Sequence, residues 1–294
     1  MDICEIIAVY FSPAGKTKDV CLRIANACAH ALQVPLYEDD FTLPATHAEN
    51  TIRTYNSKSL VVFAVPTYAG RIPNKALPFV QTLFKGNGTK AVAVATFGNR
   101  SYDNVLAELC YELTKAQFCV VGAGAFVCKH SFANIGTARP NENDIEEQQQ
   151  FGADVASLLQ TQDETIFTNY LPVRDATKKI VTEYTAVEHY YTPLGVDGQP
   201  ALFLKAKPIT DVALCDGCME CVSRCPMGSI AKDNPANVPG ICIKCHACVL
   251  CCTRHAKSFD DIAFLSHKKY LEQTYQQPAK NEVFLAAANS DSAL

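Results

Sequence analysis

The cysteines in the last third of the chain are the residues whose type and spacing point most directly to chemistry. They form two runs, and each run has the spacing C-x2-C-x2-C-x3-C. Thiolates are soft ligands that suit iron–sulfur clusters and zinc. The first run is Cys215, Cys218, Cys221 and Cys225, and the second run is Cys242, Cys245, Cys248 and Cys252. The spacing therefore predicts metal centres in this part of the chain.

Three cysteines in series followed by a more distant fourth are typical of proteins with two [4Fe–4S] clusters. In that pattern the fourth cysteine of each run ligates the cluster of the other run. We therefore expect a first-run cluster on Cys215, Cys218, Cys221 and Cys252, and a second-run cluster on Cys242, Cys245, Cys248 and Cys225. Cys251 lies next to Cys252 and could replace it, although the x3 spacing favours Cys252.

Two other metal-binding patterns share part of this spacing. Tetrahedral zinc sites use C-x2-C pairs, but they need two pairs for each metal rather than three cysteines in series plus one. The segment 242–246 reads C-I-K-C-H and matches the attachment signature of c-type haem. That match lies inside a longer cysteine run, and we expect no secretion signal at the N-terminus. Two clusters therefore explain the spacing better than zinc or haem.

The composition is that of a globular protein with a small negative charge. Of 294 residues, 48% are hydrophobic and 19% are charged, and the net charge is −4. This charge argues against nucleic acid as a partner. Acidic residues stand near the N-terminus, where a signal peptide needs a basic region. Apolar runs stay well short of the roughly 18 residues that a membrane span requires. We therefore expect a cytoplasmic protein that keeps its thiols reduced and binds neither nucleic acid nor a membrane.

Apolar runs that alternate with amphipathic segments predict an α/β fold. Residues 5–11 form a continuous apolar run, as expected of a buried parallel strand. Further strands are expected at 34–37, 60–65, 90–95 and 118–127, and helices at 20–28, 74–84, 101–115 and 144–159. This alternation predicts a doubly wound sheet of five parallel strands that is covered on both faces. Asp144 and Glu147 have the spacing of a capping box for the last helix. Gly122 and Gly124 are expected to allow close packing rather than to form a dinucleotide fingerprint.

The same patterns divide the chain into four parts. Residues 1–165 form the α/β domain, and residues 208–270 form a small α+β domain with both cysteine runs. Between them, the connector 166–207 is too long for a plain loop, and we expect it to pack across both domains. Residues 178–191 fit a helix. The tail 271–294 gives little indication of its structure.

The loop after the first strand has the features of a phosphate site. Hydroxyl groups at Ser12 and Thr17 accompany the backbone N–H groups of residues 14–17, where a helix is expected to begin. The segment Gly15-Lys16-Thr17 also suggests a nucleotide-binding P-loop, but that motif requires glycine where Tyr10 stands. The loop therefore favours a phosphate-bearing ligand and argues against a nucleoside triphosphatase.

Two further loops at strand ends combine aromatic residues with glycine. They read V-P-T-Y-A-G-R-I-P at 65–73 and T-F-G-N-R-S-Y-D-N at 96–104. With the phosphate loop F-S-P-A-G-K-T-K at 11–18, they resemble flavodoxin. Together with the two cysteine runs, the chain resembles the flavodoxin–ferredoxin fusion proteins of anaerobes, often called EFR1-type ferredoxins.

This resemblance implies FMN as a cofactor beside the two clusters. It implies that the phosphate is bound by Ser12, Ala14, Gly15, Lys16 and Thr17. It implies that the flavin ring lies between one loop, Pro66, Thr67, Tyr68, Ala69 and Gly70, and a second loop, Thr96, Phe97, Gly98, Asn99, Arg100, Tyr102 and Asp103. Tyr68 and either Phe97 or Tyr102 are the candidates for stacking on the ring.

Two arginines in the flavin loops depart from the acidic character of free flavodoxins. Residues 1–165 carry 17 acidic and 13 basic residues. Arg71 and Arg100 are either solvated or paired with nearby carboxylates, or one of them stabilises the reduced, anionic flavin. Arg100 is the preferred candidate for that contact, because it follows Gly98, where the backbone can approach the ring.

The combination of cofactors suggests three functions. The first is electron transfer between FMN and the clusters, with redox proteins as donor and acceptor. The second is an FMN-dependent reductase of a small oxidised substrate that receives electrons through the clusters, and the third is a redox sensor. A walled, polar-lined cavity above the flavin would favour the reductase.

The remaining cysteines of the α/β domain lack metal-ligand spacing. They fall in expected strands and helices, where free cysteine behaves as a small apolar residue. We therefore expect structural roles for Cys4, Cys21, Cys28, Cys110, Cys119 and Cys128.

Overall fold

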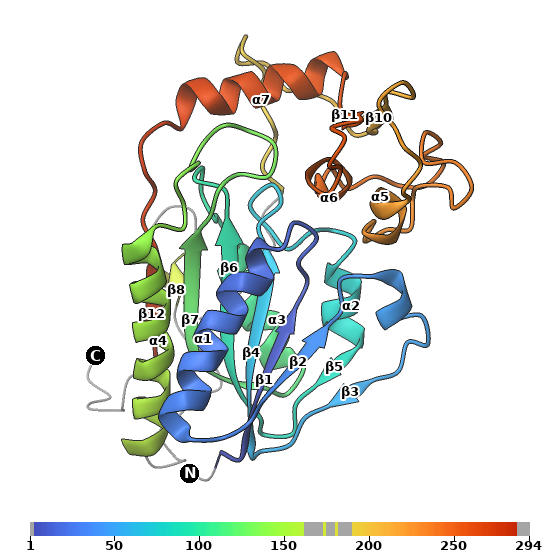
Figure 1. Ribbon diagram of the computed structural model, residues 1–294. Helices are drawn as coiled ribbons and strands as arrows, with labels where there is room; N and C mark the ends of the chain where they lie inside the picture. The colour runs from blue at the N-terminus through green and yellow to red at the C-terminus, as the bar shows by residue number, and fades with distance from the viewer. Residues whose placement is uncertain (1–2, 162–172, 175–179, 182–189, 287–294) are drawn as a thin grey trace.

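A doubly wound α/β sheet forms the centre of the protein (Figure 1). The computed structural model describes residues 3–161, 173–174, 180–181 and 190–286. Within these residues the main sheet has the strand order β12-β7-β6-β4-β1-β2. The strands are β1 Glu5–Tyr10, β2 Leu36–Asp40, β4 Ser59–Pro66, β6 Lys90–Phe97, β7 Cys119–Val127 and β12 Glu282–Leu285.

The first five of these strands pair in parallel. Taken in chain order they lie as 2-1-3-4-5, which is the order of flavodoxin-like doubly wound sheets. The predicted doubly wound sheet of five parallel strands is therefore confirmed. The sequence pattern finds these strands well because β1, β4, β6 and β7 are buried on both faces and read as nearly continuous apolar runs.

Helices cover both faces of the sheet, and each face has its own hydrophobic core. On one face lie α1 (Lys16–Leu32) and α4 (Glu142–Thr161), which contribute Ile24 and Phe151 to the core. On the other lie α2 (Leu77–Thr82) and α3 (Val105–Lys115), which contribute Val80 and Leu109. The expected helices at 74–84 and 101–115 are therefore present but begin three or four residues later.

Gly122 and Gly124 allow α4 to pack closely on β7, as predicted. A Cβ at Gly122 would lie 3.2 Å from the Val155 side chain, and one at Gly124 would lie 2.5 Å from the Phe126 ring. Larger residues at these positions would therefore push the helix or the neighbouring ring away.

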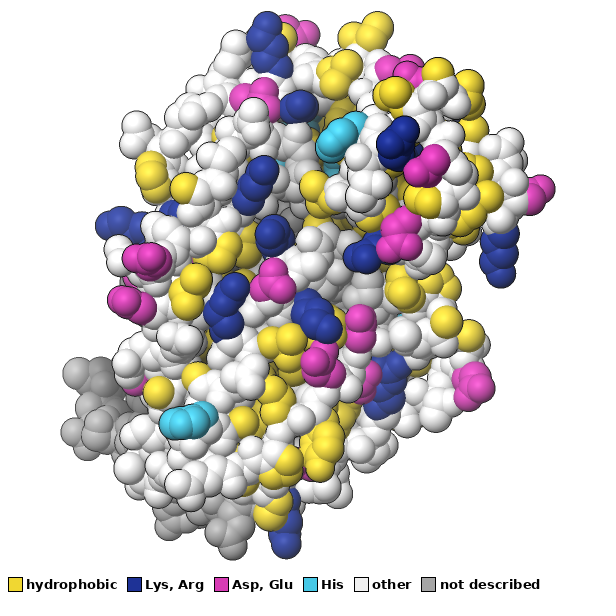
Figure 2. All heavy atoms as spheres, in the orientation of Figure 1, with side chains coloured by type: hydrophobic (Ala, Val, Ile, Leu, Met, Phe, Trp, Pro, Cys, Tyr) yellow, Lys and Arg dark blue, Asp and Glu magenta, His cyan; other side chains and the backbone are white. Residues whose placement is uncertain are grey.

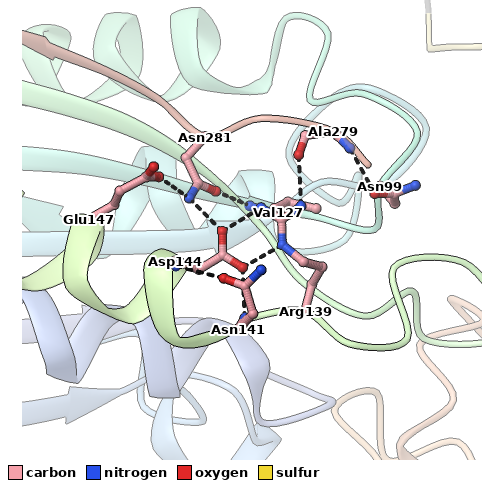
Figure 3. A network of polar contacts seen from close by, with 8 residues as sticks. All are labelled: Asn99, Val127, Arg139, Asn141, Asp144, Glu147, Ala279 and Asn281. Carbon is pink, nitrogen blue, oxygen red and sulfur yellow. Dashed lines mark hydrogen bonds and ion pairs between the residues drawn. The ribbon is translucent and has the colours of Figure 1, made fainter. Parts of the chain in front are cut away.

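The strand β12 was not predicted, and it adds an antiparallel edge to the sheet beside β7. The segment before it is fixed by the polar network of Figure 3. Asn281 accepts a hydrogen bond from the Val127 N–H (2.8 Å) and donates to Asp144 (2.9 Å). Arg139 pairs with Asp144 and donates to the Ala279 carbonyl (2.8 Å). Part of the expected tail is therefore integral to the α/β domain.

The start of α4 differs from the expected capping box. The Asp144 carboxylate accepts the Asn141 N–H (2.8 Å), and the Asn141 side-chain oxygen accepts the Asp144 N–H (3.0 Å). Asp144 is therefore the third helical position of a box that begins at Asn141. Glu147, the expected partner, accepts a hydrogen bond from Asn281 instead (2.5 Å).

Short elements make up the rest of the described chain. In the α/β part these are a 3-10 helix at Pro44–Thr46 and the paired strands β3 (Arg53–Thr54) and β5 (Phe84–Lys85). In the cysteine-rich part, β10 (Ile209–Thr210) pairs with β11 (Lys257–Ser258), and the helices are α5 (Glu220–Ser223), α6 (Ala247–Leu250) and α7 (Ile262–Thr274). In Figure 1, α7 lies across the top of the molecule and continues past the boundary expected at residue 270.

The connector contains a small strand pair in place of part of the expected helix. β8 (Val173–Arg174) and β9 (Ile180–Val181) are antiparallel. The helix expected at 178–191 is therefore wrong at Ile180 and Val181, and residues 182–189 lie outside the described part of the chain. The β-branched side chains of this segment favour extended backbone.

Candidate functional site

A cavity of about 230 Å³ lies at the carboxyl ends of the parallel strands. It is lined by residues from the loops that follow β1, β4, β6 and β7. We call it the strand-end cavity. Doubly wound sheets bind their ligands at this edge, near the point where the strand order switches. Most of the predicted flavin residues meet here: Ala14, Lys16, Thr17, Pro66, Thr67, Tyr68, Ala69, Gly70, Thr96, Phe97, Gly98 and Arg100.

The phosphate loop is held open by its own hydrogen bonds. Ser12 accepts the Lys18 N–H on its hydroxyl (2.8 Å) and donates its own N–H to Thr42 (2.8 Å). Gly15 precedes α1 with φ of 81°, and a Cβ added there would meet only open space. The hydroxyls of Thr17 and Thr96 bond to each other (2.7 Å). The backbone amides at the start of α1 are therefore the main donors for an anion, whereas Ser12 shapes the loop from outside the lining.

The loop after β4 makes a tight turn toward the loop after β6. Tyr68 and Arg71 exchange backbone hydrogen bonds of 2.9 and 3.2 Å, and Ala69 and Gly70 have positive φ. A Cβ at Gly70 would overlap the Asp103 carboxylate, so glycine is required there. The Thr67 hydroxyl is buried without a hydrogen-bond partner in the described protein. A buried polar atom without a partner is uncommon in a folded protein.

Arg71 is part of the protein interior and lies outside the cavity lining. Its guanidinium pairs with Glu108 on α3, and the Tyr190 ring lies 4.8 Å from it. Glu108 also accepts the Ile72 N–H (2.9 Å). Arg71 therefore fixes the turn to α3, and of the alternatives expected for it, pairing with a carboxylate holds rather than solvation.

Arg100 lines the cavity. It pairs with Asp103, and its guanidinium lies 4.0 Å from the centre of the Tyr191 ring. Asp103 thus holds Arg100 and stays behind the lining itself. The expected pairing with a nearby carboxylate therefore occurs, at a residue that also lines the cavity.

Of the two ring-stacking candidates in this loop, Phe97 lines the cavity and Tyr102 lies outside the lining. The Tyr102 hydroxyl donates to Glu282 (2.9 Å) and its ring packs against Phe97. Asn99 also has a structural position, because its amide donates to the carbonyls of Tyr275 (2.8 Å) and Gln277 (3.0 Å) and accepts the Ala279 N–H (3.0 Å). Tyr102 and Asn99 therefore hold the C-terminal segment against the sheet.

The loop after β7 contributes a wall that the sequence analysis missed. It places Cys128, Lys129, His130, Ser131 and Phe132 on the cavity. The rule that ligands bind at strand ends, applied to the fifth strand as well, would have indicated these residues. Cys128, expected to be purely structural, therefore stands at the cavity wall.

His130 is held in one tautomer. Its Nδ1 accepts the N–H groups of Phe132 (3.3 Å) and Ala133 (3.1 Å), so its proton lies on Nε2. Burial, together with the charges of His267, His246 and Arg100, lowers the pKa of His130 to about 3. At neutral pH the ring is therefore a neutral N–H donor. A Cβ at Gly98 would overlap this ring, which explains the glycine in the neighbouring loop.

Residues of the connector and the cysteine-rich part cover the cavity, and we call this set the roof. They are Tyr191, Pro193, Phe203, Ile243, Lys244, His267 and Leu271. The Tyr191 N–H bonds to the Ala69 carbonyl (2.8 Å), and His267 on α7 lies 2.9 Å from the Leu194 carbonyl. The roof therefore joins segments that lie far apart in the sequence directly to the loop after β4.

The eight cysteines predicted as ligands separate into two small cavities. The first-run cavity is lined by Cys215, Cys218, Cys221 and Cys252. The second-run cavity is lined by Cys225, Cys242, Cys245 and Cys248. Each cavity combines three cysteines of one run with the fourth of the other. Cys251 lies outside both linings and directs its thiol to the Cys248 carbonyl (3.6 Å).

The backbone around the two runs has the same conformation at equivalent positions. Left-handed residues occur at Gly217 and Lys244, at Met219 and His246, and at Gly228 and His255. Such positive-φ residues turn successive N–H groups to one side and form concave anion sites. Three of the cysteine sulfurs accept backbone N–H groups at 3.3–3.4 Å: Cys225 from Ser229, Cys242 from Lys244 and Cys252 from Ala256.

Among the described residues, no group of three or more His, Cys, Asp or Glu side chains is placed to hold a single metal ion. A cluster of four iron and four sulfur atoms differs from a single ion, because its ligands surround a body of several atoms rather than one point.

Comparison with known proteins gives matches to solved structures alone. No protein-family model and no curated protein matches the chain. A flavodoxin from the domain Archaea is 17% identical and covers 53% of this chain and 99% of its own, with a TM-score of 0.37. The apo form of an NADH:FMN oxidoreductase (EMOB) is 12% identical and covers 56% and 95%, with a TM-score of 0.41. The flavodoxin of Megasphaera elsdenii is 16% identical and covers 51% and 98%, with a TM-score of 0.34. The flavodoxin-like fold class follows from the strand order itself.

No helix within the described residues is long and apolar enough to cross a membrane.

Proposed function

We propose that this chain is an electron-transfer iron–sulfur flavoprotein that passes electrons between two [4Fe–4S] clusters and FMN. The observation that carries the proposal is the division of the eight cysteines into two crossed sets of four, each around its own cavity. Crossed ligation is the arrangement of two-cluster ferredoxins. Tetrahedral zinc sites use two ligand pairs for each metal rather than three neighbouring cysteines plus one distant cysteine.

The backbone groups around the cysteines suit the chemistry of an iron–sulfur cluster. Backbone N–H groups that point to ligating sulfurs stabilise the negative charge of a cluster and affect its potential. Ser229, Lys244 and Ala256 supply such groups. The repeated left-handed positions turn further amides inward around both cavities.

The strand-end cavity fits FMN by the donors that it offers. The amides at the start of α1 and the Lys16 side chain would hold the phosphate. Tyr68 and Phe97 would pack on the ring, Arg100 would stand near its polar edge, and the roof would exclude water.

FMN, when bound, exchanges one or two electrons, whereas each cluster exchanges one. This chain's own contribution is to hold these groups close together and to keep solvent away from them. We found no nicotinamide fingerprint in the sequence. We therefore propose that redox proteins are the electron donor and the electron acceptor. We also propose that the protein acts in the cytoplasm of an anaerobe.

Anaerobic purification followed by quantification of iron, sulfide and FMN tests the proposal. We expect about eight iron and eight sulfide atoms and one FMN for each chain. About four iron atoms would contradict the assignment of two clusters. Stoichiometric zinc in place of iron would contradict cluster binding altogether.

The covered cavity also supports a second function, the reduction of a small oxidised molecule at FMN. His130 offers a neutral N–H donor there, and roof residues line part of the space, whose surface is more apolar than polar. A small substrate would displace water and change the absorption spectrum of bound FMN. Titration of the FMN-loaded protein with small quinones and nitroaromatic compounds tests this function, and an unchanged spectrum for all of them would leave electron transfer as the function.

A further inference from the structure

The two cysteine cavities have different positions relative to the strand-end cavity. Ile243 lines both the strand-end cavity and the second-run cavity. Lys244, which follows it, lines the strand-end cavity from a position between Cys242 and Cys245. The second-run cavity and the strand-end cavity therefore share a wall one residue thick.

Tyr68 also lines the strand-end cavity, together with Ile243 and Lys244. The backbone hydrogen bonds between Tyr68 and Arg71 fix its position. Tyr68 therefore lies on the strand-end side of the wall that Ile243 shares with the second-run cavity.

The first-run cavity lies farther from the strand-end cavity and closer to solvent. In the described part of the chain, these two cavities have no lining residue in common. Cys218 is exposed, and Cys215 is half-buried. Figure 2 shows hydrophobic side chains at the surface of the cysteine-rich part, and Val212 and Leu214, which precede Cys215, are among the exposed ones.

The two cysteine cavities are themselves adjacent. Cys221 of the first-run cavity and Cys248 of the second-run cavity pack with Ile230 in one buried hydrophobic cluster. The order along the molecule is therefore strand-end cavity, second-run cavity, first-run cavity and solvent.

A direct approach of a large partner to the strand-end cavity is hindered by the roof. Tyr191, Phe203 and His267 cover it, and the rings of Phe203 and His267 are stacked 5.5 Å apart. A protein partner would have to displace these packed residues before it reached a flavin.

We infer that the first-run cluster is the terminal that exchanges electrons with external one-electron carriers, and that the second-run cluster is the neighbour of the flavin. Ile243 would stand between the two groups when they are bound, and Tyr68 would line the flavin side of this wall. In the reducing direction, two carrier molecules are each oxidised by one electron. The two electrons pass singly through the clusters and reduce one flavin by two electrons, and water supplies the protons. This inference rests on the proposed function and adds an order of transfer to it.

Stopped-flow reduction of the fully loaded protein by methyl viologen radical cation tests this order. The variants Cys218→Ser and Cys245→Ser each remove one cluster, and freeze-quench electron paramagnetic resonance follows the remaining one. For Cys245→Ser we expect reduction of the remaining cluster at the wild-type rate and flavin reduction slowed at least tenfold. For Cys218→Ser we expect the remaining cluster and the flavin to be reduced together, both slowly.

An exchange of these two signatures would overturn the inference. Flavin reduction at the wild-type rate in both variants would also overturn it, because the donor would then reach the flavin directly. If wild-type protein holds fewer than two clusters or no FMN, the proposed function fails. If it holds all three groups and the signatures are exchanged, the order alone fails.

A pair of variants with intact cysteines keeps the test decisive if a serine variant does not fold. Tyr68→Leu removes the ring at the shared wall, and Tyr37→Leu removes an exposed ring from the far edge strand β2. With iron and FMN contents equal to wild type, we expect Tyr68→Leu to slow transfer from cluster to flavin by three-fold or more. Tyr37→Leu should leave that rate unchanged. An unchanged rate in Tyr68→Leu would remove Tyr68 from the proposed path.

Discussion

Arg71 and Arg100 stand in neighbouring strand-end loops, yet their guanidinium groups have different surroundings. Arg71 is paired with the buried Glu108, and Arg100 lines the cavity while pairing with Asp103. The loops that carry both arginines could be predicted from local sequence. The role of Arg71 could not, because Glu108 lies 37 positions away on another element.

Replacement of each arginine by glutamine separates these roles. Arg100→Gln should lower the potential for the second one-electron reduction of bound FMN, because a cation near the ring stabilises the reduced anion. A charge-assisted hydrogen bond of about 1.5 kcal/mol corresponds to about 60 mV, and the partial neutralisation by Asp103 makes this an upper value. Spectroelectrochemistry measures the shift.

Arg71→Gln should leave the potential unchanged and lower the free energy of unfolding by about 3 kcal/mol, because Glu108 loses its buried partner. A shift in Arg71→Gln alone would contradict this assignment.

Cys225 and Cys251 form a second informative pair of residues. Cys225 lines the second-run cavity although it belongs to the first run, whereas Cys251 lies outside both linings. Cys225→Ser should reduce the iron content by about half and remove the signal of the second-run cluster. Cys251→Ser should leave iron at the wild-type level. Iron analysis and electron paramagnetic resonance of reduced protein measure both effects, and loss of the first-run cluster in Cys225→Ser would show that ligation is not crossed.

At the scale of elements, the strands β1, β4, β6 and β7 could be predicted to within a few residues because burial on both faces leaves long apolar runs. The strand β12 could not. Its four residues, Glu282–Leu285, alternate between half-buried and exposed, and its partner β7 lies more than 150 positions earlier. The connector shows the same limitation, since its β-branched residues fit a helix by spacing and an extended strand by propensity.

The network around Asp144 holds β12 to the rest of the sheet and predicts a pH-dependent stability. Burial opposes ionisation of Asp144, but Arg139, Asn141 and Asn281 outweigh it and lower the pKa of this carboxyl. Its contribution is therefore complete above the unfolded-state pKa of about 3.9 and is lost as the pH falls through the lower folded-state value. Asp144→Asn should lower the free energy of unfolding at pH 7 by about 3 kcal/mol, because Arg139 loses its partner.

Urea unfolding of wild type and Asp144→Asn from pH 7 to pH 3 measures this effect. The difference between the two proteins should decrease below about pH 4. Glu146→Gln is the matched control, because Glu146 is exposed on the same helix and should change stability by less than about 0.5 kcal/mol. A difference that stays constant down to pH 3 would show that the Asp144 charge contributes nothing.

At the scale of the whole molecule, the strand-end cavity is built from two kinds of segment. Its floor comes from loops that follow strands, and local sequence indicates such loops through glycines and aromatic residues. Its roof comes from Tyr191, Phe203 and α7, which reach the cavity through the long-range packing of the connector and the cysteine-rich part. No local pattern marks those residues, so the sequence analysis left open whether the cavity is covered.

A covered cavity predicts that FMN stabilises the roof as well as the strand-end loops. A ligand that binds the folded arrangement stabilises it by about 2.7 kcal/mol at a concentration of 100 times its Kd. Hydrogen exchange with mass spectrometry, on cluster-loaded protein with and without FMN, should therefore show slower exchange in residues 12–19, 66–71, 190–206 and 262–274. Residues 152–161 of α4 lie at the opposite end of the sheet and serve as an internal control with unchanged exchange. Protection of the strand-end loops without protection of 190–206 and 262–274 would show that the roof does not close on the flavin, and a partner could then reach the ring directly.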